Sequence, residues 1–452
     1  MSKGKYVAYV SSYTQGDSHG IRIYDVDMKN GRFKEKDKVE ITNSSYLTIS
    51  HNGKFLYSIT DFGVEAYTIM PDGDLELINF APINGMRGCY VSTDYTDQYL
   101  FVAGYHDGKL TVLRLKEDGS IGEITDEIYH KGLGSMAERN FRPHINCARM
   151  THDNKYLLVA DQGMDHVNVY RFDVEKGKVK LEDIIRSEME SAPRHIKISE
   201  DGRYIYILHE LKCYIDVYEY VDHDNDPTFE KIQTVELIKL TRGNTNSASA
   251  FSFSLDYNYL LSSIAGDNSV IVFNVDKKTG LLKKNFLLPV SGEYPKDAEF
   301  FPDNKFLVSL NHESNTMTFF HIEPSGTVYR ILHQIADGSL IQGRMAVPHP
   351  IFRIQVIPDI VNLLPAGCQT AIVFFVSPVS VFCLLPLSCV SLKLCLGANR
   401  KNSCASSCQQ KCSCQNALHG FLYFSLSEFH KYRPLLSICN CISSYQKNMT
   451  VL

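Results

Sequence analysis

The chain has 452 residues, a formal net charge of −5 and a hydrophobic fraction of 44%, which is the composition of a globular protein. Because there is no basic excess to neutralise phosphates, nucleic acid is not expected as a partner. Three of the 13 cysteines lie in residues 1–357, and the other ten lie between Cys368 and Cys441. Acidic residues show the opposite bias, since only Asp359 and Glu428 follow Pro358. The two parts of the chain therefore need separate interpretations.

The first residues show no targeting signal. Lys3 and Lys5 are followed by alternating polar and apolar residues, without the apolar core or the small-residue cleavage site of a signal peptide. The three scattered cysteines of the body suit a reducing compartment. We therefore expect a cytoplasmic protein.

A repeat organises residues 1–357. Each copy has an anchor residue that opens an alternating segment, and a second anchor 12 to 18 residues later in another alternating segment. Turn-forming pairs such as Asn52-Gly53 and Asp72-Gly73 separate the segments. The first anchors are Tyr6, Phe55, Tyr99, Tyr156, Tyr204, Tyr259 and Phe306, and the second are Tyr24, Tyr67, Leu113, Tyr170, Tyr218, Phe273 and Phe320. Seven repeats of four short strands predict an all-β, seven-bladed β-propeller.

The first repeat lacks the innermost strand that precedes the first anchor in the others. A closed ring has to take this strand from the other end of the chain, or it leaves an open edge. Prolines precede several of the inner strands, as at Pro143, Pro193 and Pro295, and the same pattern returns at Pro350. We therefore expect a strand near residues 350–357 to close blade one, and the propeller to span residues 1–357.

Polar residues collect at the start of the inner strands and at the end of the second strands. In an antiparallel blade these two places lie on the same face, so the residues of successive blades converge on one mouth of the central channel. They include imidazole, carboxylate, guanidinium and ammonium groups, which together indicate an anionic substrate and proton transfer. The candidates are His144, Asp161, Arg194, His195, Glu210 and Lys296.

Several of these residues belong to motifs that recur in a fixed order, from about Tyr6 to about Ile354. The motifs are Ser12-Tyr13-Thr14, Glu138-Arg139 ahead of Pro143-His144, Ala160-Asp161-Gln162-Gly163, Ala192-Pro193-Arg194-His195 and His209-Glu210-Leu211. In this order the chain resembles the lactonase-type seven-bladed propellers, a family that includes 6-phosphogluconolactonases and carboxy-muconate cyclases.

The resemblance implies an enzyme that opens a sugar-derived lactone, first of all 6-phosphogluconolactone, without a cofactor or a metal ion. It implies a catalytic group of His144, Arg194 and Glu210, with His195, Lys296 and Asp161 binding the substrate. Arg194 would hold the anionic group or polarise the lactone carbonyl, and either His144 or Glu210 would act as the general base. Lys296 stands where many relatives are expected to have arginine, and lysine is a point charge rather than a bidentate fork.

Other interpretations remain open at this stage. The same arrangement would serve a muconate-type cycloisomerase, and a propeller rim can also be a non-catalytic surface for a protein partner. Arg194 and Glu210 could form a structural ion pair. The expected partner is a small anionic lactone, with neither nucleic acid nor membrane, and the expected assembly is a monomer or a weak homo-oligomer.

Residues 358–452 do not follow the propeller pattern. The 33 residues from Ile360 to Leu392 carry no charge and are long enough to span a bilayer, but three prolines interrupt them, so they make a poor transmembrane helix. Four cysteines between Cys404 and Cys414 have no regular metal-binding spacing. We expect this Cys-, Ser- and Leu-rich tail to be disordered or a product of frameshift or read-through, and to carry no site.

Overall fold

The structure is a computed structural model that describes residues 6–14, 19–134, 141–239, 246–323, 328–335, 345–346, 371–373 and 384–386. The chain divides into two compact units, Met1–Phe352 and Arg353–Leu452. In the second unit the described residues form two antiparallel strands, β29 (Ala371–Val373) and β30 (Leu384–Pro386). The rest of the predicted tail lies outside the described residues. No helix in the described part is long and apolar enough to cross a bilayer.

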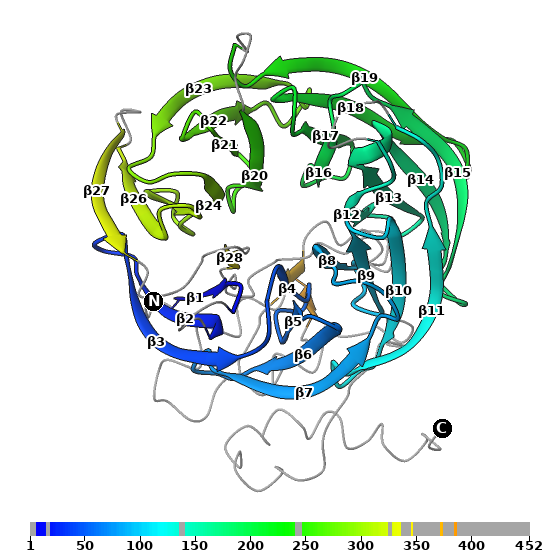
Figure 1. The fold of residues 1–452 in the computed structure, drawn as a ribbon, viewed down its shortest axis with the longest axis horizontal. Coiled ribbons are helices and arrows are strands. Elements are labelled where there is room, and N and C mark those ends of the chain that lie inside the picture. Colours follow the sequence, from blue (N-terminus) through cyan, green and yellow to red (C-terminus); the bar gives the residue numbers. More distant parts are fainter. Residues whose placement is uncertain are drawn as a thin grey trace, which may run out of the picture. The chain divides into compact units, whose positions relative to one another are not determined.

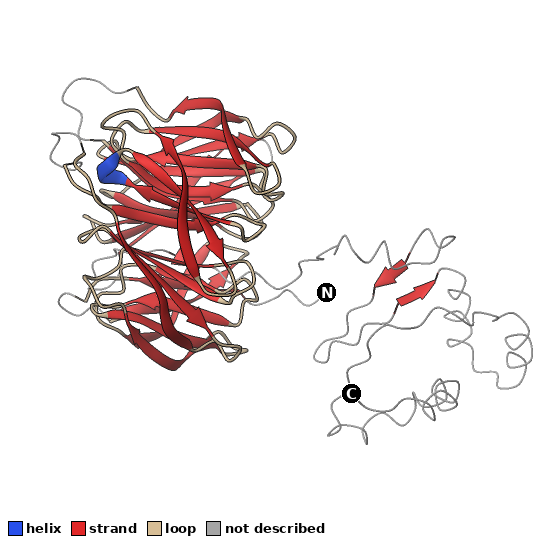
Figure 2. Ribbon diagram, turned by 90° about the vertical axis from the view of Figure 1, so that its right-hand side faces the viewer, coloured by secondary structure: helices blue, strands red, loops and turns tan. Residues whose placement is uncertain are grey.

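Seven four-stranded antiparallel sheets make up the first unit and surround a central channel (Figure 1). Strands account for nearly all of its regular structure, and the one helix among the described residues is the short 3₁₀ turn η1 (Gln162–Met164) (Figure 2). The predicted all-β, seven-bladed β-propeller is confirmed.

Each blade runs from the channel outward in sequence order, apart from blade one. Blade one consists of β28 (Met345–Ala346), β1 (Tyr6–Ser11), β2 (Gly20–Asp27) and β3 (Arg32–Glu40). Blade two consists of β4 (Leu47–Ile49), β5 (Phe55–Ile59), β6 (Gly63–Ile69) and β7 (Leu75–Pro82). Blade three consists of β8 (Tyr90–Thr93), β9 (Tyr99–Gly104), β10 (Lys109–Leu115) and β11 (Ile121–Tyr129).

The other four blades follow the same order. Blade four consists of β12 (Ile145–Met150), β13 (Tyr156–Asp161), β14 (His166–Asp173) and β15 (Lys178–Arg186). Blade five consists of β16 (Pro193–Ile198), β17 (Tyr204–His209), β18 (Tyr214–Asp222) and β19 (Pro227–Glu236). Blade six consists of β20 (Ser247–Phe253), β21 (Tyr259–Ala265), β22 (Ser269–Val275) and β23 (Leu282–Pro289). Blade seven consists of β24 (Pro295–Phe300), β25 (Phe306–Asn311), β26 (Thr316–Ile322) and β27 (Val328–Ile335).

The predicted anchors mark equivalent positions in all seven blades. Each first anchor is the first residue of the second strand of its blade, and each second anchor lies in the third strand. The aromatic residues pack across the boundary between neighbouring blades: Phe172 of blade four contacts Tyr99 and Phe101 of blade three edge to face, with centroid distances of 4.9 and 5.4 Å. The repeat was detectable because every blade boundary needs such a bulky apolar residue.

Buried tyrosines also connect several neighbouring blades by hydrogen bonds. The hydroxyl of Tyr57 in blade two donates to the carbonyl of Gly119 in the β10–β11 hairpin of blade three, at 3.1 Å. The hydroxyl of Tyr206 in blade five donates to the carbonyl of Gly280 in the β22–β23 hairpin of blade six, at 2.8 Å. These bonds satisfy polar groups that the packing of the blades buries.

Ring closure uses a strand from the C-terminal end of the first unit, but earlier in the sequence than expected. Strand β28 pairs antiparallel with β1, with Ala346 opposite Tyr9 and Met345 opposite Val10. Strand β28 thus pairs with the inner edge of β1, which would otherwise have unpaired backbone groups. The expected closing segment, residues 350–357, lies outside the described residues.

Blade five contains a buried Ser–His–Asp cluster. The Nδ1 atom of His209 lies 3.1 Å from the hydroxyl of Ser191, and its Nε2 atom lies 3.5 Å from a carboxylate oxygen of Asp216. All three residues have an exposed fraction of 0%, so this structure leaves a substrate no access to them. Burial lowers the pKa of His209, although the Asp216 carboxylate acts in the opposite direction.

We expect His209 to make the stability of the propeller depend on pH. Because its pKa is lowered in the folded state, the unfolded state binds the proton first, and the free energy of unfolding should fall as pH drops below about 6.5. Urea unfolding between pH 5 and pH 8 should show a shallower pH dependence for His209→Gln than for the wild type. Replacing the exposed His223 by Gln is the control, and an unchanged pH slope in His209→Gln would contradict this account.

Candidate active site

The innermost strands of blades four to seven each contain an extra residue near their start. In β16 the register shifts between Pro193, opposite His209, and His195, opposite Leu208, so that Arg194 is the extra residue. Equivalent shifts lie around Asn146 in β12, Ser249 in β20 and Lys296 in β24. A β-bulge redirects the side chain that it carries, and here all four of these side chains line one cavity.

This cavity lies at the channel and has a volume of about 290 Å³. Six aromatic residues belong to its wall, namely Tyr13, Tyr46, Tyr90, Tyr105, Phe251 and Tyr294, and the lining as a whole is more polar than apolar. Amide and hydroxyl groups between the rings belong to Ser45, Asn146, Gln162 and Ser249. Aromatic faces with interspersed hydroxyl and amide groups suit a small ligand that has both apolar faces and hydroxyl groups.

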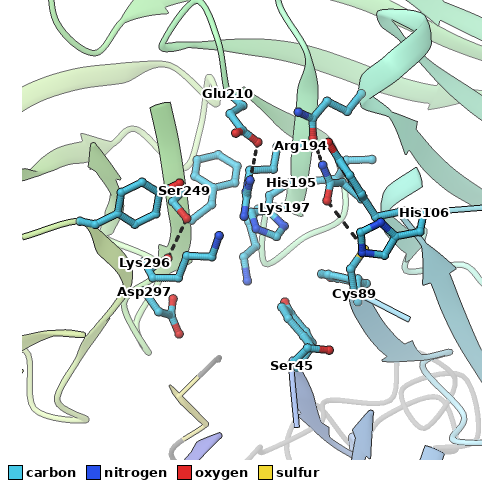
Figure 3. A pocket seen from close by; sticks show the side chains of 18 of the residues that line it. Ser45, Cys89, His106, Arg194, His195, Lys197, Glu210, Ser249, Lys296 and Asp297 are labelled. Atoms are coloured by element: carbon cyan, nitrogen blue, oxygen red, sulfur yellow. Dashed lines mark hydrogen bonds and ion pairs between the residues drawn. The ribbon is translucent and has the colours of Figure 1, made fainter. Parts of the chain in front are cut away.

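Five charged side chains also face this cavity, and Figure 3 shows them around a common space. Three are cationic, namely Arg194, Lys197 and Lys296, and two are acidic, namely Glu210 and Asp297. The formal charges of these five side chains therefore sum to +1, whereas the net charge of the whole chain is −5. A cleft with this local excess attracts an anion against the field of the whole protein.

Arg194 and Glu210 form a buried ion pair in the cavity wall (Figure 3). The guanidinium donates to one oxygen of Glu210, and the Ser247 hydroxyl donates to the other at 2.8 Å. Burial alone would raise the pKa of Glu210, but the charges of Arg194 and Lys296 outweigh it and hold the pKa below its usual range. The Nε atom of Arg194 is buried without a hydrogen-bond partner among the described residues, so the guanidinium keeps unused donor capacity.

Two imidazoles and one thiol also line the cavity. His195 lies next to the rings of Tyr46 and Tyr90, with centroid distances of 6.5 and 5.8 Å. His106 lies across the ring of Tyr105 at 5.3 Å. Burial raises the pKa of Cys89 to about 12, so this residue is a neutral thiol and a poor nucleophile.

His144 is not among the residues that line this cavity, although it contacts one of them. Its ring stacks on Tyr105 at a centroid distance of 4.3 Å, and its Nδ1 atom lies 2.7 Å from the carbonyl oxygen of Tyr105. A carbonyl accepts only a donated proton, so Nδ1 carries the hydrogen and Nε2 is the acceptor in the neutral ring. His144 therefore has a fixed tautomer. Its exposed fraction is only 4%.

Asp161 is fully buried behind the cavity and holds the segment around His144. One of its oxygens accepts hydrogen bonds from the amides of His144, Gly163 and Met164, at 2.9, 3.1 and 3.2 Å. The other lies 2.7 Å from Nδ1 of His130. Hydrogen bonds therefore occupy both oxygens of the carboxylate. Asp161 positions His144 and caps η1, and it is not among the residues that line the cavity. The structure therefore gives Asp161 a supporting place, where sequence reasoning had expected a substrate contact.

The structure brings four of the six candidates together in the cavity wall, namely Arg194, His195, Glu210 and Lys296. His144 and Asp161 are not among the residues that line it, and Glu138-Arg139 lie outside the described residues. Among the charged residues of the cavity, sequence reasoning missed Lys197 and Asp297. The period of two along a strand could have found Lys197, because it follows His195 by two residues on the same face.

The family described as "Lactonase, 7-bladed beta-propeller" matches residues 7–339. The chain belongs to this family. It is 30% identical over 363 residues to the 6-phosphogluconolactonase of Bacillus subtilis, covering 77% of this chain and 97% of that protein. The 6-phosphogluconolactonase of Formosa agariphila is 27% identical over 326 residues, covering 69% of this chain and 91% of that protein.

Solved structures of similar proteins show the same fold. A putative 6-phosphogluconolactonase from Bacteroides fragilis has a TM-score of 0.69 and 26% identity, covering 77% of this chain and 99% of that one. A periplasmic gluconolactonase from Pseudomonas aeruginosa has a TM-score of 0.70 and 25% identity, covering 76% of this chain and 99% of that one. The matching proteins thus carry names for both phosphorylated and unphosphorylated sugar lactones.

Proposed function

We propose that this lactonase-family propeller hydrolyses a sugar-derived lactone, with 6-phosphogluconolactone as the substrate. The observation that carries the proposal is the Arg194–Glu210 pair in the wall of a cavity with a local positive charge. A lactone of this kind has hydroxyl groups for the amide and hydroxyl lining, and a carbonyl oxygen that becomes negative during the reaction.

Arg194 stabilises that developing charge. Water attacks the lactone carbonyl carbon and gives a proton to the general base, and the carbonyl oxygen becomes an oxyanion. Collapse of this intermediate breaks the ring carbon–oxygen bond, and the protonated base returns the proton to the leaving alkoxide to form the alcohol. The new carboxylic acid releases its proton to solvent and leaves as a carboxylate. A fixed cation at the oxyanion position is worth more in a partly buried site than in water, because it needs no reorganisation during the reaction. Glu210 and Ser247 fix the guanidinium in this geometry.

His144 is the general base that takes the proton from the attacking water. Of the two bases that the sequence left open, Glu210 is the weaker, because its pKa is held low and both of its oxygens accept hydrogen bonds. His144 presents Nε2 as an acceptor, since Nδ1 is bound to the carbonyl of Tyr105. It acts on the cavity through a bound water, since the imidazole lies behind Tyr105.

The expected result for His144→Gln is a fall in kcat of about 10²–10⁴-fold with a small change in KM. Glutamine keeps a donor for the Tyr105 carbonyl but removes the basic nitrogen. The assay follows acid release from 6-phosphogluconolactone, with spontaneous hydrolysis subtracted. His195→Gln is the matched control, because His195 lines the cavity and should affect KM more than kcat.

Two outcomes would count against this proposal. If His195→Gln removes kcat while His144→Gln keeps it, His195 is the base and the role of His144 is wrong. If the wild-type protein is no faster than buffer, hydrolysis of this lactone is not its function.

A further inference from the structure

Arg149 differs from the paired arginines of the propeller. Six other arginines each form an ion pair with a carboxylate, namely Arg22, Arg87, Arg114, Arg171, Arg194 and Arg203. Arg149 is half-buried, and its Nε atom is buried without a hydrogen-bond partner among the described residues. It forms no ion pair with any residue that the structure describes. Arg149 is therefore a cation for which the described part of the chain supplies no counter-ion.

Tyrosines from two other blades lie near the Arg149 guanidinium. Its Cζ atom is 5.7 Å from the centroid of the Tyr95 ring, in the turn that follows β8 of blade three. Burial acts to lower the pKa of Arg149, but the phenols of Tyr95, Tyr90 and Tyr257 act in the opposite direction, and the pKa is raised above its usual value. Tyr90 belongs to β8, and Tyr257 follows β20 of blade six. Figure 1 shows β8, β12 and β20 around the central channel, so the phenols approach Arg149 from both sides of it.

This part of the channel is distinct from the lactone cavity. Arg149 is not among the residues that line the cavity, and it follows Asn146, which does line it, by three positions in β12. Three positions correspond to about 10 Å along an extended strand, toward the opposite mouth of the channel. In that direction the rings of His51 and His152 each lie 4.4 Å from the Tyr95 ring. Arg149 thus stands between the cavity and an aromatic cluster at the far mouth.

Arg149 belongs to a polar layer that recurs in blades two to seven. It lies opposite Leu158, the third residue of the second strand of its blade. The equivalent positions of the other five inner strands hold Thr48, Ser92, Lys197, Ser252 and Glu299. Both carboxylate oxygens of Glu299 lie 2.7 Å from the Ser252 hydroxyl, between blades six and seven. The formal charges of this layer sum to +1, which favours an anion in the channel at this level.

The chemistry around Arg149 fits a carboxylate better than a phosphate. Removing a guanidinium from water is costly, and a single cation–π contact with Tyr95 offsets only part of this cost. The planar guanidinium fork matches a carboxylate through two parallel hydrogen bonds. One excess positive charge balances a monoanion, whereas a phosphate monoester carries nearly two negative charges at pH 7. The tyrosine rings offer apolar faces for the rest of such a ligand.

We propose that Arg149, with Tyr90, Tyr95 and Tyr257, forms a second binding site in the channel for a small carboxylate with an apolar or aromatic body. The carboxylate pairs with the Arg149 guanidinium, and the body of the ligand lies against the tyrosine rings. This inference goes beyond the proposed lactonase function and does not depend on it, because none of its evidence involves the Arg194–Glu210 pair.

Calorimetric titration of the full chain with benzoate tests the site. Benzoate should bind the wild type, and benzamide, its neutral analogue, should not. Arg149→Met should weaken benzoate binding by about 10–100-fold, the loss typical of a hydrogen bond to a charged group. Arg171→Met is the matched control in the same blade. Arg171 also lies over a tyrosine, with its Cζ atom 5.6 Å from the Tyr156 ring centroid, but it pairs with Glu182 at 2.9 Å. Arg171→Met should bind benzoate as the wild type does.

A second measurement locates the ligand. In crystals soaked with 4-bromobenzoate, the anomalous signal of bromine should lie beside Tyr95 and Arg149. A signal at Arg194 alone would overturn the site, as would equal binding of benzoate and benzamide. Tighter binding of inorganic phosphate than of benzoate at Arg149 would overturn the carboxylate class.

Thermal unfolding separates binding from a structural role of Arg149. Because Arg149→Met removes a cation that has no counter-ion among the described residues, its melting temperature should equal or exceed that of the wild type. Benzoate should raise the melting temperature of the wild type but not that of the variant. A marked fall in the melting temperature of Arg149→Met, together with unchanged benzoate binding, would make Arg149 a structural residue and overturn the proposal.

Discussion

Replacing Arg194 by methionine is expected to lower kcat/KM for the lactone by about 10²–10³-fold, the effect of removing one oxyanion donor. The same change should reduce the free energy of unfolding by about 3–5 kcal/mol, because it leaves a buried carboxylate without its cation. The side chain of Glu210 has an exposed fraction of only 4%, so solvent screens its carboxylate weakly and the guanidinium is its main stabilising partner. Steady-state kinetics and urea unfolding measure the two effects separately.

A double variant separates the chemistry of Arg194 from its contribution to stability. Arg194→Met combined with Glu210→Met removes both charges, so most of the lost stability should return, whereas activity should stay low. Arg194→Lys keeps the charge but loses the planar fork, and an intermediate activity is expected. If the double variant regains wild-type activity, the ion pair is structural and Arg194 does not take part in the reaction.

The sequence predicted the ring because the repeat reflects a requirement of every blade. Each second strand starts with a bulky residue at the packed boundary, so the anchors from Tyr6 to Phe306 recur whatever the rest of the blade contains. The closing strand has no such requirement. Within the described residues it pairs through Met345 and Ala346, whereas the alternating segment after Pro350 gave a stronger pattern in the sequence and lies outside the described part. Pairing in a ring depends on which segment reaches the edge, and local alternation does not encode this.

Part of the site was predictable as well, because the blade architecture fixes which residues lie at the channel mouth. Strand direction places Arg194 and Lys296 at the channel mouth, and this follows from an antiparallel blade. The bulges that turn these side chains into the cavity are single-residue shifts in register, which leave no pattern in the sequence. In blade four the bulge residue is Asn146, and His144 lies two positions before it, where its ring stacks on Tyr105. The proline that precedes both His144 and Arg194 suggested the same place for the two residues, and only the register of the strands separates them.

Asp161→Ala should be the second variant with a large effect, because one carboxylate supports several buried groups. Its loss leaves the amides of His144, Gly163 and Met164 without their acceptor, and the free energy of unfolding should fall by about 3–5 kcal/mol. The segment that carries His144 should shift, and a displacement of about 1 Å in a catalytic group can lower the rate about 10²-fold. We therefore expect kcat to fall far more than KM rises.

His130→Ala distinguishes positioning from a general loss of stability. His130 contacts the other oxygen of Asp161 at 2.7 Å, so its removal should also destabilise the fold, while the hydrogen bond from the His144 amide remains. Urea unfolding should show a loss in both variants, and kinetics should show a fall in kcat in Asp161→Ala only. Equal falls in kcat would mean that activity follows stability alone. Asp161 would then have no positioning role. The oxygen that accepts from the His144 amide is not the oxygen that His130 contacts, so the loss of His130 should leave His144 in place.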